Sequence, residues 1–182
     1  MSIPRLTEIF ENIFDGANDR LKVGVQSNLA EGSDTITIGT GAAHASGDVV
    51  STDAGEILEF DTGLPAGTGG VILSTLTTLG QNAVFLGGAG YTLYLFNASP
   101  TVQATNVAFD IADADLSKYI GKIQISTLID NGSNCSKTDT DQNFPFKLAA
   151  ADTKVYGKLV CTGDETTVSS KIITIKNNII LI

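Results

Sequence analysis

The chain has 182 residues, a length that can bury a sizeable core as a single domain. Only 17% of its residues are charged, and its formal net charge is −9. No Lys or Arg occurs between Lys22 and Lys118, so this long stretch lacks the cations with which proteins neutralise nucleic-acid phosphates. The same lack of cations disfavours enzymes that transfer phosphoryl groups.

The segment 3–15 is the only one that predicts a helix. Ser2 and Gly16 suit its two ends, and its apolar residues recur at helical spacing on one stripe. Such a short helix is marginal in water by itself, so the stripe needs a docking surface, either the core of its own domain or a groove on a partner. We therefore divide the chain into an N-terminal helical arm, 1–20, and a single β domain, 21–182. The stripe consists of Leu6, Ile9, Phe10, Ile13 and Phe14.

From residue 20 onward the apolar residues alternate with a period of two, and Gly-rich turn clusters interrupt them. Short strands at near-regular spacing predict an all-β protein, either an antiparallel sandwich or a barrel. The segment 110–119 is compatible with one helical turn. The predicted strands are 21–26, 35–39, 48–51, 56–60, 70–78, 83–86, 91–97, 106–109, 119–129, 144–149, 154–162 and 170–182.

Two of these strands indicate contact with other protein. The segment 91–97, YTLYLFN, carries large side chains on both faces, which a strand with one solvated face should lack. Neighbouring protein should therefore cover its second face, within the subunit and also beyond it. The segment 170–182 is β-prone and nearly uncharged, so an open edge there would aggregate. It must pair inside a sheet or be covered by another subunit.

The candidates for chemistry are few, and each has a simpler explanation. His44 lies in a Gly/Ala-rich loop beside Ser46 and Asp48, but a catalytic triad is defined by geometry across a fold, so we interpret His44 as a structural loop residue. The segment 139–144, DTDQNF, lacks the Gly and Glu of a calcium loop. The aspartates of DIADAD, 110–115, are explained by turns and a helix start.

The two cysteines are too few for a disulfide framework or a zinc site. We predict that both are reduced, with Cys161 a small strand residue and Cys135 a loop thiol. The first residues resemble no signal peptide, and no apolar run is long enough to span a membrane. We therefore expect synthesis in a cytoplasm, no membrane or nucleic-acid partner, no cofactor, no metal and no enzymatic activity.

An ordered series of short motifs resembles a known family. The series comprises SGDVVS at 46–51, GGVILSTLTTL at 69–79, YTLYLFNASPT at 91–101, TNVAFDIADADLSKYIGKIQI at 105–125, FPFKLAAADTKVYGKLVCTG at 144–163 and TVSSKIITIKNNIIL at 167–181. It resembles the head decoration (cement) and virion structural proteins of tailed bacteriophages, and it covers about 45–182. The arm, 1–20, is not part of the pattern.

The resemblance implies a jelly-roll-like β-sandwich that binds the outside of a phage head, commonly as a homotrimer, and stabilises the lattice of the major capsid protein. The protein would then reside on the capsid surface of the virion after synthesis in the bacterial host. A carbohydrate- or receptor-binding module of a head or tail fibre, and a tail-tube or connector component, are the alternatives. Under the first interpretation we expect contacts between subunits or with the capsid at Leu6, Ile9, Phe10, Ile13, Phe14, Ile179, Ile180, Leu181 and Ile182.

Overall fold

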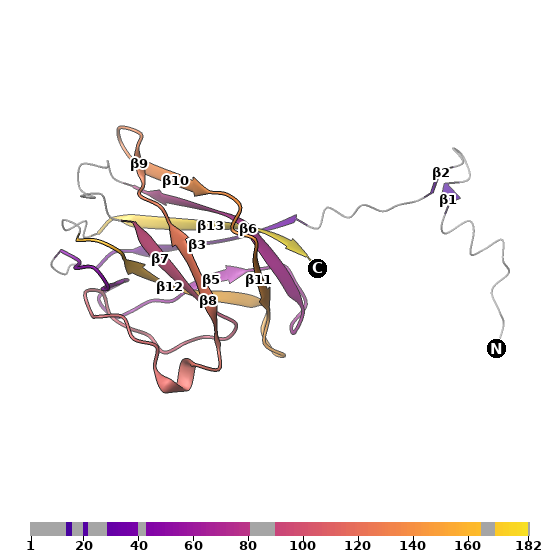
Figure 1. Cartoon of the computed structure of the whole chain (residues 1–182), viewed down its shortest axis with the longest axis horizontal. Helices are drawn as coiled ribbons and strands as arrows, with labels where there is room; N and C mark the ends of the chain where they lie inside the picture. The colour runs from indigo at the N-terminus through magenta and orange to yellow at the C-terminus, as the bar shows by residue number, and fades with distance from the viewer. Residues whose placement is uncertain are drawn as a thin grey trace.

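The computed structural model describes residues 14–15, 20–21, 29–39, 43–80, 90–164 and 170–181 (Figure 1). Within these ranges every paired strand is antiparallel, which confirms the all-β prediction. One short 3-10 helix, η2 (Asp113–Asp115), interrupts the strands and confirms the predicted helical turn. The strands are β1 (Phe14–Asp15), β2 (Arg20–Leu21), β3 (Leu29–Thr37), β4 (Val49–Val50), β5 (Leu58–Asp61), β6 (Gly69–Leu79), β7 (Tyr91–Phe96), β8 (Tyr119–Ile125), β9 (Ile129–Asp130), β10 (Cys135–Asp139), β11 (Phe144–Lys147), β12 (Lys154–Cys161) and β13 (Ile172–Leu181).

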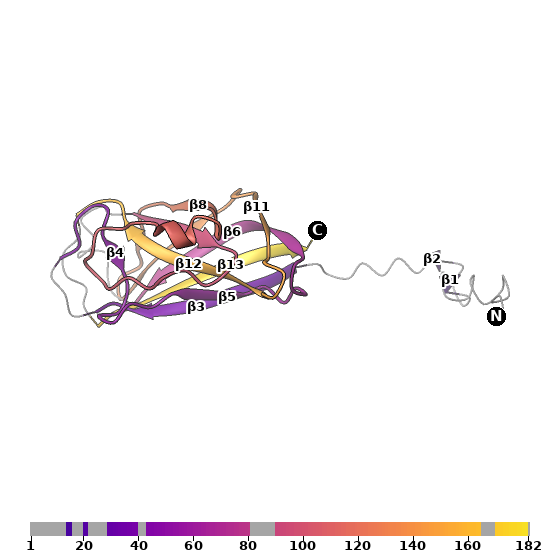
Figure 2. The same cartoon turned by 90° about the horizontal axis from the view of Figure 1, so that it is seen from below.

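The strands from β3 onward form two sheets. The six-stranded sheet has the order β3-β13-β6-β10-β9, with β11 also paired to β6. The five-stranded sheet has the order β4-β12-β7-β8, with β5 also paired to β12. At one side of the molecule β3 lies beside β5, so the two sheets meet there without backbone pairing between these strands (Figure 2).

The strand order is that of a jelly roll, in which two sheets interleave strands from the whole chain. If the two-residue strands are left out and β11, which pairs with β6 next to β10, is counted together with β10, one sheet reads first, eighth, third, sixth, and the other reads second, seventh, fourth, fifth. The eight strands counted are β3, β5, β6, β7, β8, β10, β12 and β13. The topology identifies the architecture as a jelly roll. It does not identify the activity, because proteins with the same fold can have different functions.

The core lies between the two sheets, where alternate side chains of each strand point inward. On β13 the inward residues Ile173, Ile175 and Ile179 are fully buried, while Ile172 and Asn178 of the same strand are exposed. Facing positions of the other sheet contribute large aliphatic and aromatic side chains to the same core. These positions include Leu58, Phe60, Leu93, Leu95, Ile123, Val155 and Leu159.

The predicted helix over 3–15 is wrong at its last two residues, because Phe14 and Asp15 form strand β1, which pairs with β2. The sequence DGAND that begins at Asp15 is rich in turn formers, which suit a hairpin better than a continuing helix. Residues 3–13 lie outside the described residues. The division into an arm, 1–20, and a body, 21–182, stays a prediction.

Most predicted strands are confirmed within a few residues. The predicted strand 35–39 starts too late, because β3 begins six residues earlier, at Leu29. The segment 106–109 is no strand: it contributes one isolated bridge, between Ala108 and Asp48, and Asn106 has φ 58°. The predicted strand 119–129 divides into β8 and β9, and β10 was not predicted. The predicted strand 83–86 and residues 22–26 of the first one lie outside the described residues. Among the helices that the structure describes, none is long and apolar enough to cross a membrane.

Candidate functional site

The second face of β7 is covered by the chain itself. The segment 97–118, which joins β7 to β8, packs over the outer face of the five-stranded sheet, and η2 lies in front of β12 in Figure 2. The ring of Phe109 lies 4.1 Å from that of Tyr94, measured between centroids. Phe96 is fully buried. The expectation of cover within the subunit is therefore correct, and the outer face of β7 is not the free contact surface that its sequence suggested.

Lys158 holds the covering segment against the sheet. Its side chain is only 3% exposed, and its Nζ donates a hydrogen bond of 3.0 Å to Oε1 of Gln103. The same Nζ lies 5.8 Å from the ring centroid of Phe96 and 5.9 Å from that of Phe109, within the range of a cation–π interaction. Burial lowers the pKa of Lys158, and the nearby carboxylates of Asp115 and Asp110 oppose that shift.

Asp115 fixes the other end of the segment. Its carboxylate is fully buried, accepts a hydrogen bond of 2.7 Å from the backbone N–H of Thr101, and forms an ion pair of 2.8 Å with Nζ of Lys118. Burial alone would raise the pKa of Asp115, but the hydrogen bonds from Lys118 and Thr101 outweigh it and hold the pKa below its ordinary value. The sequence predicted a turn or helix-start residue at Asp115, which lies in η2 and also holds this loop closed.

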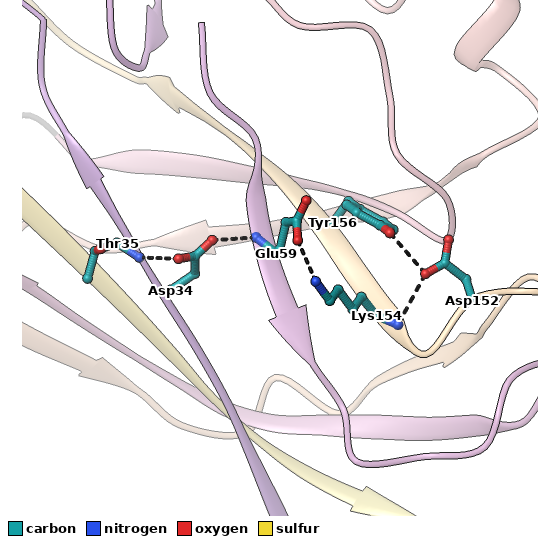
Figure 3. Close-up of polar contacts among 6 residues, drawn as sticks. All are labelled: Asp34, Thr35, Glu59, Asp152, Lys154 and Tyr156. Atoms are coloured by element: carbon teal, nitrogen blue, oxygen red, sulfur yellow. Dashed lines mark hydrogen bonds and ion pairs between the residues drawn. The ribbon is translucent and has the colours of Figure 1, made fainter.

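An acidic groove of about 650 Å³ lies where β3, β5 and β12 meet the start of the covering segment. Figure 3 shows the polar chain that runs along it, from β3 to β12. Four carboxylates and one ammonium group line the groove, so its charge favours cationic groups. The lining residues are Asp34, Glu56, Ile57, Glu59, Asp61, Ser99, Val102 and Lys154.

Two of the groove carboxylates, Asp34 and Glu59, hold strands of the sandwich together. Asp34 accepts hydrogen bonds from the backbone N–H groups of Thr35 (2.8 Å) and Glu59 (2.6 Å), and so bridges β3 and β5 where their backbones do not pair (Figure 3). Glu59 accepts a hydrogen bond of 2.6 Å from Nζ of Lys154. Among the described residues, no three His, Cys, Asp or Glu side chains are grouped so that they could hold a metal ion.

Two titrating groups of β12 adjoin the groove. The hydrogen bond to Glu59 raises the pKa of Lys154. Burial, with a hydrogen bond of 2.9 Å from the phenol to Oδ1 of Asp152, raises the pKa of Tyr156 to about 12 (Figure 3). A phenol that keeps its proton at alkaline pH in the folded state makes folding pH-dependent.

We expect the protein to lose stability as the pH rises from about 10, because the unfolded chain then releases the Tyr156 proton while the folded chain retains it. The loss from this residue should reach about 1.4 kcal/mol by roughly pH 11, since one pKa unit corresponds to that energy. Urea unfolding at pH 8 to 11, with the Tyr156→Phe variant as control, measures it. All other titrating groups remain in the variant, so parallel curves for the two proteins would contradict the assignment.

The outer face of the six-stranded sheet differs from that of the five-stranded one, because its side chains remain accessible. At one end, four apolar residues lie in register across four strands: Leu29 of β3, Ile180 of β13, Val71 of β6 and Pro145 of β11. We call these four residues the apolar row. Leu29 is 61% exposed, Pro145 is exposed, and Ile180 and Val71 are half-buried.

The rest of this outer face is polar. A second row in register carries hydroxyl groups, on Thr35, Thr174, Thr78 and Ser136. Between the two rows, Lys176 pairs with Glu31 (3.1 Å), and Asn178 donates a hydrogen bond of 2.8 Å to Ser74. A groove of about 400 Å³ lies beyond the hydroxyl row, beside the exposed Ile172. This sheet face thus carries a row of four apolar residues at one end and one exposed apolar residue, Ile172, at the other.

The structure divides the predicted contact residues into three groups. Ile179 is fully buried in the core of its own chain, so its side chain packs within the subunit and is not an accessible contact. Ile180 points outward in the apolar row. Phe14 and Leu181 lie in β1 and β13, but their side chains lie outside the described residues, as do Leu6, Ile9, Phe10, Ile13 and Ile182.

His44 is a buried loop residue whose Nε2 lies 2.8 Å from Oγ1 of Thr105. The neighbouring residues have other partners: Asp48 accepts a hydrogen bond from the backbone N–H of Ala45, and Ser46 Oγ donates one to the carbonyl of Thr162. The three side chains suggested by the sequence are thus placed in a structural loop. This geometry agrees with the structural interpretation.

The prediction for Cys161 is confirmed, because it is a buried residue at the end of β12. The prediction of a loop thiol at Cys135 is wrong: this residue begins β10 and is fully buried in the core. Burial, with the nearby charge of Asp130, raises the pKa of the Cys135 thiol. Both cysteines are unbridged.

Comparison with known proteins yields no family. No protein-family model matches the chain, and no curated protein matches it. Solved structures that resemble it include the K3 adhesin domain of Lys-gingipain from Porphyromonas gingivalis W83 (10% identity, 82% of this chain and 73% of that chain, TM-score 0.32). Particles of Israeli acute paralysis virus (14% identity, 85% and 73%, TM-score 0.26) and Kashmir bee virus (14% identity, 91% and 78%, TM-score 0.28) also resemble it. Similarities this weak support no inference about function.

Proposed function

We propose that this protein is a virion structural protein that decorates the head of a tailed bacteriophage. In this role it binds the outer surface of the assembled capsid as a homotrimer, contacts the major capsid protein and stabilises its lattice. It catalyses no reaction and requires no cofactor, nucleic acid or membrane. It is made in the cytoplasm of the bacterial host and acts on the virion, with the arm, 1–20, serving as a contact segment outside a single β body, 21–182.

One observation carries the proposal: the two outer faces of the sandwich differ. The chain covers the outer face of the five-stranded sheet around Tyr94 and Phe96 with its own segment, 97–118, held by Lys158 and Asp115. The outer face of the six-stranded sheet keeps exposed apolar residues such as Leu29 and Ile172. A rigid body with one open, partly apolar face suits contact with other protein. The ordered motifs described above add the expectation that this other protein is a phage capsid.

The stabilisation needs no chemistry. A protein that binds the assembled lattice and not its dissociated subunits shifts the equilibrium toward the lattice by mass action. The groups on the surface fit such a role, because the groove carboxylates Asp34 and Glu59 are occupied with structural hydrogen bonds and an ion pair. The alternative, a receptor-binding module, gains little support from the groove, whose lining contains no aromatic ring on which a sugar could stack.

The test uses purified protein and capsids of the encoding phage assembled without it. We expect saturable, stoichiometric binding and a higher melting temperature of the decorated capsids. Deleting residues 1–16 should lower both the oligomer mass in solution and the capsid occupancy, while the strands from β3 to β13 still fold. A deletion with unchanged mass and occupancy would remove the arm from the proposal. Glycan-array binding together with no affinity for capsids would overturn the decoration function in favour of a receptor-binding module.

A further inference from the structure

The apolar row is the most anomalous feature of the open sheet face. Its four residues come from four strands and lie side by side only because of the register between them. Neighbouring strands are about 4.8 Å apart, so the row extends roughly 14 Å across the sheet. The residues that follow along the strands, such as Glu31 and Asn178, are polar and exposed. The apolar row is therefore a strip at one end of the face, bordered by polar residues and separate from the exposed Ile172 at the other end.

This strip lies where the N-terminal segment joins the body. Leu29, which is 61% exposed, is the first residue of β3 and follows directly on residues 22–28. The chain before β2 contains five large apolar residues, Leu6, Ile9, Phe10, Ile13 and Phe14. Its strand β1 pairs with β2 and with no strand of either sheet, so this hairpin adds nothing to the sheets of its own subunit.

We propose that the apolar row of one subunit is the docking site for the N-terminal segment, residues 3–14, of a second copy of this chain. The seven residues between β2 and β3, 22–28, span up to roughly 25 Å when extended. Measured from Leu29 at the edge of the sheet, this is several strand spacings, so the N-terminal segment can reach past its own subunit. Four side chains bury far less than the about 1,200 to 2,000 Å² of a specific interface. An arm laid across the row supplies the missing area.

This inference rests on the proposed function in one respect, because decoration as a homotrimer requires copies of the chain to associate. It names which surface receives which segment. It also predicts a head-to-tail arrangement, since the donating segment and the receiving row are different parts of the chain. A heterologous contact of this kind closes into a ring when the rotation between copies allows it.

The experiment introduces one cysteine into each of two chains that carry tags of different size: Phe10→Cys in one and Val71→Cys in the other. The native Cys135 and Cys161 are buried, so they should not compete. After co-expression and mild oxidation, we expect a disulfide-linked pair that contains both tags. The matched control replaces Val71→Cys with Thr78→Cys, which lies on the same strand and face but in the hydroxyl row, and it should give no product.

The outcomes separate the alternatives. A product that contains both tags supports docking between copies. No product overturns it, and so does a double variant, Phe10→Cys with Val71→Cys, that forms only an internal cross-link, because the segment then docks on its own subunit. Capsid binding of the same reduced variants is measured separately. Saturable capsid binding without cross-linking defeats this inference alone, whereas cross-linking without capsid binding defeats the decoration function alone.

Discussion

Replacing Phe60 with alanine is expected to lower the free energy of unfolding by about 3 to 5 kcal/mol. The ring is fully buried in β5, at the side of the sandwich where β5 meets β3. A Cβ built on Gly157 would lie 3.0 Å from Cε2 of Phe60, and one built on Gly32 would lie 3.1 Å from its Cβ. Two glycines therefore leave space for this residue, and their lack of side chains means that little could move in to fill the cavity.

Urea unfolding followed by circular dichroism measures the Phe60→Ala effect, with an unchanged m-value as evidence that the unfolding transition is comparable. The control is Val107→Ala, because Val107 is 46% exposed and its truncation should change the stability by less than about 0.5 kcal/mol. Since the total free energy of unfolding of such a domain is only about 5 to 15 kcal/mol, Phe60→Ala should also lower the yield of folded protein. A cost below about 1 kcal/mol would show that the junction of β3 and β5 is not closely packed.

Replacing Asp115 with alanine should cost about 2 to 4 kcal/mol at neutral pH, because it leaves the Thr101 N–H without its acceptor and Lys118 without its counter-charge. The cost should depend on pH. Because the folded-state pKa of Asp115 lies below its ordinary value, the stabilisation is complete above about pH 4 and disappears as the pH falls through the folded-state pKa. The variant and the parent should therefore approach each other in stability under acid conditions.

Thermal and urea unfolding of both proteins at pH 7 and near pH 3 test this prediction. Asp113→Ala is the matched control, since Asp113 belongs to the same 3-10 helix but is exposed, and its loss should be nearly neutral at both pH values. Hydrogen exchange across 97–118 gives a second measurement, which should show faster exchange in Asp115→Ala alone. An equal penalty at both pH values would mean that the carboxylate charge contributes nothing.

The period-two pattern was sufficient to predict most strands, because each one buries alternate residues against the core. The failures have local causes. The strand β10 has the sequence CSKTD, in which polar residues follow a turn cluster, so it reads as loop. The segment 106–109 alternates as a strand should, yet Asn106 adopts a left-handed conformation and the segment forms one isolated bridge, between Ala108 and Asp48. In both cases the position in the folded molecule decides whether the segment is a strand. The local sequence pattern carries no information about that position.

The contacts that define the surfaces could not be predicted from the sequence for a different reason. Lys158 meets Gln103, 55 residues away, and Asp34 meets Glu59, 25 residues away, so each partner depends on the strand order. One signal was available: Lys158 stands in the middle of KVYGKLVC, and a lysine inside a strand that is apolar on both faces needs a partner. The two-sided apolar character of β7 was correctly detected, but only the structure shows that the chain's own loop covers it.

The order of strands has a consequence for how the chain is made. In one sheet β13 separates β3 from β6, and in the other β12 separates β5 from β7. The central strands β12 and β13 are thus synthesised after all the strands with which they pair. Leu29, for example, can pair only after Ile180 has been synthesised. Until then the earlier strands have unpaired edges. Folding of the nascent chain therefore depends on slow pairing between distant strands, and we expect chaperones to protect the exposed edges in the meantime.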